Sequence, residues 1–118
     1  MALGVYFIVV DAVDSERLAA FWSAALDWPV AFSDPGEVAI EPPDDAGPAM
    51  LFIQAAEPKA GKNRLHLDLS CDDQDAEVRR LEGLGARRID IGQGATSWVV
   101  MADPEGNEFC VLAPEEAR

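Results

Sequence analysis

The 118-residue chain contains few of the residues that metal centres and disulfide frameworks need. It has one histidine, His66, and two cysteines, Cys71 and Cys110. A single histidine excludes a site of two histidines and one carboxylate within one chain, which is how many iron oxygenases hold their metal. Two cysteines without a CxxC pair predict neither a disulfide framework nor a zinc clip.

Basic residues and long apolar runs are scarce as well. Nine lysines and arginines stand against 22 acidic residues, so the formal net charge is −13. This charge repels nucleic-acid phosphates and anionic membranes, and we exclude both as main partners. No stretch approaches the roughly 20 apolar residues of a transmembrane helix. The N-terminal sequence MALGVYFIVVDAVD lacks the basic start of a secretion signal, so we expect a cytoplasmic protein.

The first half of the chain predicts a strand, a helix and three further strands. The apolar run Val5–Val10 predicts a strand that is buried on both faces. Asp14 is a candidate N-cap for a helix that ends at Asp27-Trp28-Pro29. Three short apolar pieces, residues 30–32, 38–40 and 49–53, are separated by turn sequences and predict antiparallel strands.

The second half repeats this order. Leu65, Leu67 and Leu69 alternate with polar residues, which predicts a strand with one polar face. A helix follows Asp72 or Asp73 and stops at residues 83–85. Strands are then expected at residues 87–91, 97–102 and 108–113. The apolar helix residues also recur 60 positions apart: Leu18, Phe21 and Ala24 correspond to Val78, Leu81 and Leu84.

The repeated order predicts an α+β fold of two βαβββ modules. We place module one at about 3–56, the linker at about 57–63 and module two at about 64–114. A four-stranded sheet of this size buries little core alone, so we expect the modules to form a single domain over residues 1–118. The alternative is a ferredoxin-like sandwich in which the repetition is accidental.

Two segments of the second half resemble a known superfamily. NRLHLDLSCDDQDAEVRRLEGLGA and SWVVMADPEGNEFCVL are similar to the second module of vicinal oxygen chelate (VOC) proteins, and DSERLAAFWSAALDW is similar to the helix of their first module. That superfamily includes glyoxalase I, extradiol dioxygenases, fosfomycin-resistance enzymes and bleomycin-binding proteins. The resemblance implies sheets that curl around a cup, with metal ligands on the first and last strand of each module.

Carried over residue by residue, the resemblance implies an incomplete metal site. His66 matches a ligand position, but its counterpart in module one is Phe7, or Tyr6 if the register shifts by one. Gln54 is a candidate for the ligand on the last strand of module one, and Cys110 stands where a metal-binding glutamate is expected. Hard divalent ions prefer carboxylates and imidazoles. With His66 and Gln54 as candidate ligands, we expect no metal or a weakly bound divalent one. Zinc or Cu⁺ on His66 and Cys110 stays open.

The polar face of residues 65–69 carries the candidate catalytic groups. His66 and Asp68 lie two positions apart on one strand and form a candidate acid–base pair, although a structural polar pair has the same pattern. Cys110 is expected to be an inert buried thiol rather than a nucleophile. Trp98 opens a strand and could line the mouth of the cup. The predicted ligand-binding residues are Phe7, Gln54, His66, Trp98 and Cys110.

Three functions are consistent with these residues. The first is a glyoxalase-like VOC protein that binds a small molecule in the inter-module cup with an incomplete metal site. The second is a lyase or isomerase of the glyoxalase I type that uses either a depleted metal site or the pair of His66 and Asp68. The third is a bleomycin-binding type of resistance protein that sequesters a cationic antibiotic, which the charge of −13 would attract. The single histidine argues against an extradiol dioxygenase.

We expect the chain to form a homodimer. It is short for two sheets and rich in apolar strand residues, so some of its surface needs covering, and most soluble oligomers are twofold symmetric. Light scattering at micromolar concentration should therefore report about twice the chain mass of 12.7 kDa. A particle with the mass of one chain would contradict the expectation.

Overall fold

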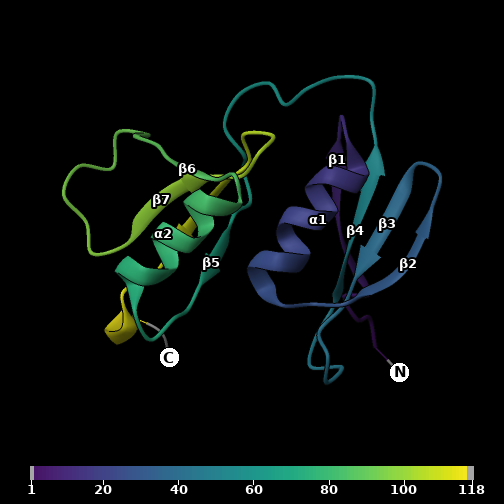
Figure 1. Cartoon of the computed structure of the whole chain (residues 1–118), viewed down its shortest axis with the longest axis horizontal. Coiled ribbons are helices and arrows are strands. Elements are labelled where there is room, and N and C mark those ends of the chain that lie inside the picture. The colour runs from purple at the N-terminus through teal and green to yellow at the C-terminus, as the bar shows by residue number, and fades with distance from the viewer. Residues whose placement is uncertain (1, 117–118) are drawn as a thin grey trace. The chain divides into compact units, whose positions relative to one another are not determined.

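The structure is a computed structural model that describes residues 2–116, and it divides the chain into two compact units (Figure 1). Unit 1 extends to Pro58, and unit 2 begins at Lys59. This boundary falls within the segment expected to be a linker. No helix among the described residues is long and apolar enough to cross a bilayer.

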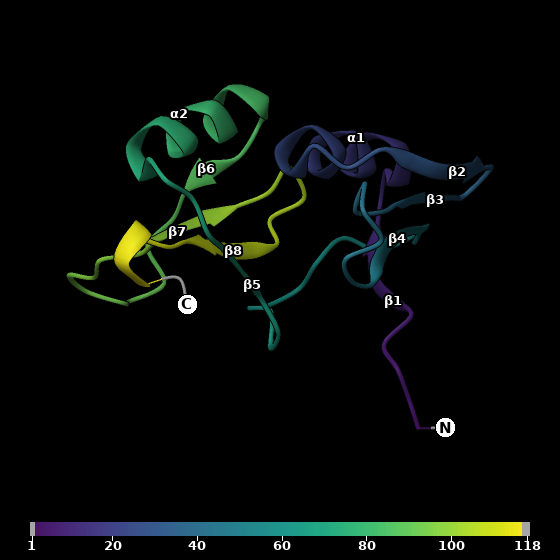
Figure 2. The same ribbon diagram turned by 90° about the horizontal axis from the view of Figure 1, so that it is seen from below.

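Unit 1 is a four-stranded sheet covered by one helix. Its elements are β1 (Phe7–Ala12), α1 (Ser15–Leu26), β2 (Val30–Asp34), β3 (Glu37–Ile40) and β4 (Ala49–Gln54). The strand order is β1-β4-β3-β2, in which β1 is parallel to β4 and the other pairs are antiparallel. The helix lies along the sheet and contacts mainly β3 and β4 (Figure 2).

Unit 2 has the same topology. Its elements are β5 (Leu67–Leu69), α2 (Gln74–Leu84), β6 (Arg87–Arg88), β7 (Val99–Ala102) and β8 (Glu108–Val111), followed by the 3₁₀ helix η1 (Pro114–Glu116). The strand order β5-β8-β7-β6 again pairs the first strand with the last in parallel. The predicted α+β fold of two βαβββ units is confirmed, and neither sheet closes into a barrel.

The two helices begin with the same cap. Asp14 and Asp73 are the N-cap residues, and each carboxylate accepts the backbone N–H three positions on, at 3.1 Å. A capping carboxylate satisfies an N–H group that has no partner within the helix. Because these caps lie 59 positions apart, they align the two helices at an offset of 59, one position less than the spacing at which the apolar helix residues recur.

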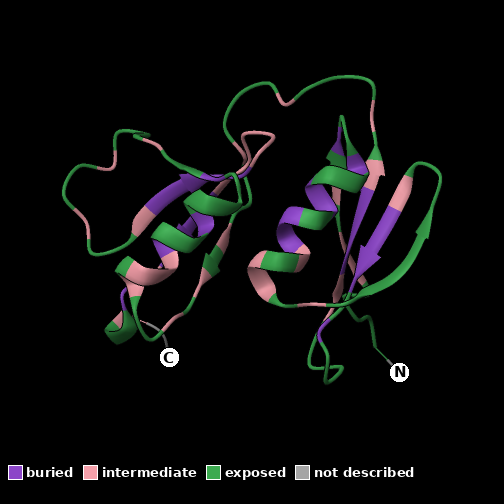
Figure 3. Ribbon diagram, viewed as in Figure 1, coloured by how far each residue is buried: buried purple, intermediate pink, exposed green. Residues whose placement is uncertain are grey.

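Each core lies between a helix and the adjacent sheet face (Figure 3). The helix residues buried in unit 1 include Leu18, Phe21 and Trp22, and those in unit 2 are Val78 and Leu81. Burying one large apolar side chain contributes about 1.5–3 kcal/mol, so the amphipathic faces hold the helices in place. Each sheet adds its own buried residues: Ile40 and Phe52 in unit 1, Met101 and Phe109 in unit 2.

Two predicted strands differ from those observed. The first strand spans Phe7–Ala12 rather than Val5–Val10 and is not buried on both faces, since Val5 and Val9 are 72% and 51% exposed. The reason is its place at the sheet edge, where it pairs only with β4. The strand expected at residues 87–91 is reduced to Arg87–Arg88.

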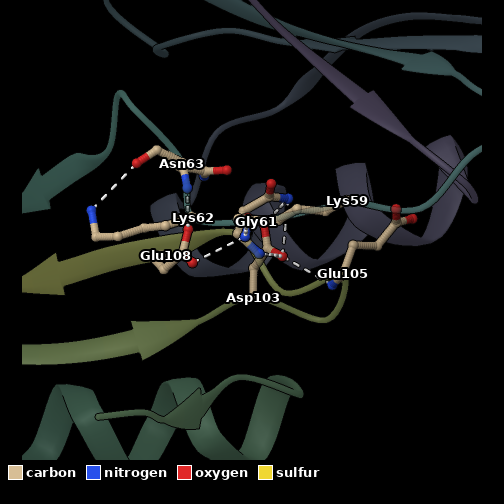
Figure 4. Close-up of polar contacts among 8 residues, drawn as sticks. Lys59, Gly61, Lys62, Asn63, Asp103, Glu105 and Glu108 are labelled. Atoms are coloured by element: carbon tan, nitrogen blue, oxygen red, sulfur yellow. Dashed lines mark hydrogen bonds and ion pairs between the residues drawn. The ribbon is translucent and has the colours of Figure 1, made fainter. Parts of the chain in front are cut away.

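A largely shielded ion pair holds the start of unit 2 against β8 (Figure 4). Lys59 Nζ lies 3.0 Å from Glu108 Oε2, and the Asn63 N–H donates to Oε1 at 2.9 Å. The Glu108 side chain is only 11% exposed. Burial by itself raises the pKa of Glu108, but the hydrogen bonds from Asn63 and Lys59 outweigh it and hold that pKa below its ordinary value.

Because its pKa is lowered in the folded state, Glu108 contributes stability above its unfolded pKa, and this contribution is lost as the pH falls through the folded value. Glu108→Gln should reduce the free energy of unfolding by about 1–2 kcal/mol at pH 7, with a smaller deficit at pH 3.5. Urea unfolding at both pH values measures this, with the exposed linker variant Glu57→Gln as control. An equal deficit at both pH values would exclude the charge as the cause.

Candidate functional site

The parallel pair β5–β8 brings three reactive side chains together. Asp68 on β5 lies opposite Cys110 on β8. His66 directly precedes β5. It stands two residues before Asp68, the spacing that places side chains on the same face of an extended segment. Its Nε2 lies 3.1 Å from Asp68 Oδ1. The ligating atoms of His66, Asp68 and Cys110 all lie within 4.8 Å of one another, and we call these three residues the β5–β8 cluster.

The β5–β8 cluster has one buried member and two exposed ones. Cys110 is 7% exposed, whereas His66 and Asp68 are open to solvent. Burial raises the pKa of the Cys110 thiol, and the negative charge of Asp68 and its hydrogen bond with the thiol raise that pKa further. The thiol is therefore protonated at neutral pH. Asp68 interacts with both His66 and Cys110, and it ties the cluster together.

Gln54, at the end of β4, has its side chain engaged within unit 1. Its Oε1 accepts hydrogen bonds from the backbone N–H and the hydroxyl of Ser15, both at 3.1 Å, and its amide N–H donates to the Val13 carbonyl. These bonds hold the start of α1 against the end of β4. The predicted part of Gln54 in metal or ligand binding stays a prediction.

The other predicted ligand-binding residues lie outside the cluster. Phe7 begins β1, and its ring packs edge-on against Tyr6 with ring centroids 4.6 Å apart. Trp98 directly precedes β7 and is partly exposed. Their contribution to a site also stays a prediction.

The internal repeat shows what unit 1 carries in place of the cluster. At the offset of 59, the counterparts of His66, Asp68 and Cys110 are Phe7, Val9 and Leu51. With the offset set by the caps, the pair of Val9 and Leu51 corresponds to the pair of Asp68 and Cys110. The equivalent position in unit 1 is therefore entirely apolar. Sequence reasoning matched His66 to Phe7 but did not match Asp68 to Val9 or Cys110 to Leu51; the spacing of the two aspartate caps was the available signal.

Comparison with protein families identifies the fold's relatives. The model of the glyoxalase-like domain matches residues 7–112, which is most of the chain. The chain belongs to the glyoxalase-like domain family. No curated protein matches it in sequence.

Solved structures of VOC proteins share the fold of this glyoxalase-like chain. A fosfomycin resistance protein from Mesorhizobium loti has a TM-score of 0.71 at 17% identity, covering 95% of this chain and 92% of its own. The bleomycin-binding protein of Streptomyces verticillus, complexed with copper(II)-bleomycin, has a TM-score of 0.61 at 16% identity, covering 96% and 98%. A glyoxalase/bleomycin resistance protein/dioxygenase family enzyme from Burkholderia phytofirmans has a TM-score of 0.68 at 15% identity, covering 92% and 97%.

VOC proteins often use divalent metals, but the residues of this glyoxalase-like chain do not fit a hard ion held between two modules. Phe7, Val9 and Leu51 have no donor atoms in their side chains, so unit 1 supplies nothing at the positions equivalent to the cluster. Unit 2 offers one imidazole, one carboxylate and one thiol. Hard ions such as Mg²⁺ and Mn²⁺ prefer oxygen donors. No chemical step of this protein is derived from such an ion.

The state of the thiol generates a test. In metal-free Cys71→Ser protein, Cys110 is the remaining thiol, and its reaction with a disulfide reagent should be slow at pH 7. The rate should rise with pH through an apparent pKa above the value of about 8.5 for a free cysteine. Stopped-flow absorbance gives the profile, and rapid reaction at pH 7 would show an activated thiolate instead.

Cys110→Ala should lower the free energy of unfolding by only about 1 kcal/mol.

Proposed function

We propose that this glyoxalase-like protein binds a small molecule at the β5–β8 cluster and acts by capturing it. The observation that carries the proposal is the convergence of an imidazole, a carboxylate and a thiol at the strand pair β5–β8, with two of the three open to solvent. Binding sites combine mostly apolar walls with a few polar groups that fix the orientation of the ligand. The cluster supplies such polar groups.

The family supports capture of a small molecule. The bleomycin-binding protein that shares this fold was determined with its copper(II)-bleomycin ligand, and another structural relative is a fosfomycin resistance protein. In this chain, an incoming hydrogen-bond donor could pair with Asp68 and an acceptor with a ring N–H of His66. We therefore expect a polar ligand that presents both donors and acceptors.

A second candidate is sequestration of a cationic antibiotic. The net charge of −13 favours a positively charged ligand and increases its rate of encounter. Attraction of this kind is screened at a Debye length of about 8 Å in physiological salt and about 3 Å at 1 M. Affinity that falls steeply with added salt would favour the antibiotic, and affinity that is nearly independent of salt would favour a neutral metabolite.

A third candidate is a lyase or isomerase that uses His66 and Asp68 as an acid–base pair. Their separation of 3.1 Å is within hydrogen-bond reach, and a carboxylate in this place can orient the imidazole. Turnover of the bound ligand separates this candidate from simple capture. A ligand that is recovered unchanged after prolonged incubation supports capture.

The proposal predicts the effect of removing the histidine. A thermal-shift screen against metabolites and antibiotics should find a ligand that stabilises the folded protein by a few kcal/mol at about 100 times its dissociation constant. His66→Ala should weaken the binding of that ligand by about 1–3 kcal/mol, because one hydrogen bond is lost. The melting temperature of the free protein should stay nearly unchanged. Titration calorimetry measures both affinities.

The matched control is Arg79→Ala, an exposed substitution on α2 that should leave binding intact. If His66→Ala binds as tightly as the parent, the cluster is not the binding site. If Cys110→Ala abolishes binding while His66→Ala retains it, the thiol and not the imidazole is the group that contacts the ligand.

A further inference from the structure

The β5–β8 cluster also has the composition of a zinc site. We infer that His66, Asp68 and Cys110 bind one Zn²⁺ within unit 2, with no ligand from unit 1. This differs from the ligand set that the VOC resemblance implies, in which both modules contribute and oxygen donors predominate. The inference does not depend on the capture of an organic molecule, since the three ligands lie together without one: Asp68 and Cys110 are strand partners, and His66 directly precedes β5.

The distances are close to those that zinc requires. Zinc–ligand bonds of about 2.0–2.3 Å in tetrahedral geometry place neighbouring ligand atoms about 3.4–3.6 Å apart. The separation of 3.1 Å between His66 Nε2 and Asp68 Oδ1 is already near this value. The longest separation within the cluster is no more than 4.8 Å, so a shift of about an ångström would close the set.

The burial pattern allows that shift. Cys110 is buried on β8, so its Sγ provides a fixed point, whereas the side chains of His66 and Asp68 are 42% and 51% exposed. The two exposed side chains can change rotamer without disturbing a packed core. Zinc is thus expected to bind to the thiol in its fixed place, with the imidazole and carboxylate moving to complete the site.

The donor types select among metals. A thiolate is a soft ligand and an imidazole a borderline one, which favours Zn²⁺ over Mg²⁺ or Mn²⁺. Binding transfers the Cys110 proton to solvent, so Zn²⁺ faces the negative charges of one thiolate and one carboxylate, and the charges balance. Three protein ligands leave the fourth tetrahedral position for water or a ligand atom, as in catalytic rather than structural zinc sites.

The chain contains its own control for thiol ligation. Cys71 is the second free cysteine, and its thiol donates to the Leu112 carbonyl at 3.3 Å. It belongs to none of the groups of three potential ligands among residues 2–116. Replacing Cys71 changes the number of thiols in the protein but leaves the proposed site unchanged.

Cobalt(II) provides the test because thiolate ligation gives a charge-transfer band in the near ultraviolet. The full chain, stripped with a chelator, is titrated with Co²⁺, and Zn²⁺ is then added as competitor. We expect a band that saturates at one Co²⁺ per chain and is abolished by one equivalent of Zn²⁺. Mg²⁺ and Mn²⁺ should not displace the bound Co²⁺. Elemental analysis of the purified protein should find no stoichiometric Ni²⁺, Fe²⁺, Mn²⁺ or Mg²⁺.

Single variants assign the ligands. Cys110→Ser should lose the band, whereas Cys71→Ser should keep it at full amplitude. His66→Ala and Asp68→Ala should each lower the affinity for Co²⁺ by at least about tenfold. Circular dichroism should show that each variant is folded. The inference is overturned if the folded parent gives no band, if the band persists in Cys110→Ser, or if Cys71→Ser alone removes it.

Discussion

The parallel pairing of the first and last strand of each unit determines the rest of the arrangement. In unit 2 it places Asp68 beside Cys110, although 42 positions separate them in the chain. A parallel pair cannot be closed by a tight turn and needs a long crossover, which the helix and the two intervening strands provide. The helix then covers the sheet face that the pairing leaves apolar. The addition of Cys110 to the local pair of His66 and Asp68 is a consequence of this topology.

The turn DPEGN, residues 103–107 between β7 and β8, has a structural role that is separate from the site. Asp103 is 1% exposed, and its carboxylate accepts the N–H groups of Glu105 and Asn107 as well as the Asn107 side-chain amide. Gly106 adopts a φ of 89°, which side chains rarely tolerate. The turn therefore sets the register of β7 on β8. It helps to place Cys110 in its position on the sheet without contributing a group to the cluster.

Local signals in the sequence predicted the topology well. Features that depend on contacts between distant segments were predicted less well. The aspartate caps and the alternation of apolar residues define helices and strands through interactions within a few residues, so the order βαβββ could be inferred twice. The exposure of Val9 depends on the place of β1 at a sheet edge, which its own apolar run does not encode. The match of Leu51 to Cys110 depends on strand register, which is fixed by pairing between distant segments. Asp68 was recognised as a partner of His66 from their spacing, but its contact with Cys110 required the fold.

The equivalence of the two strand pairs also bears on how such a protein can change. Phe7, Val9 and Leu51 occupy the same backbone framework as the polar cluster but carry no donor atoms. A duplicated unit can keep one copy for packing while the other acquires reactive side chains, and the apolar copy preserves the strand geometry on which a new site could be built. Three substitutions on β1 and β4 would give unit 1 the same set of side chains. The chain thus contains a second parallel strand pair of the same register, on which evolution or a designer could place such a set of side chains.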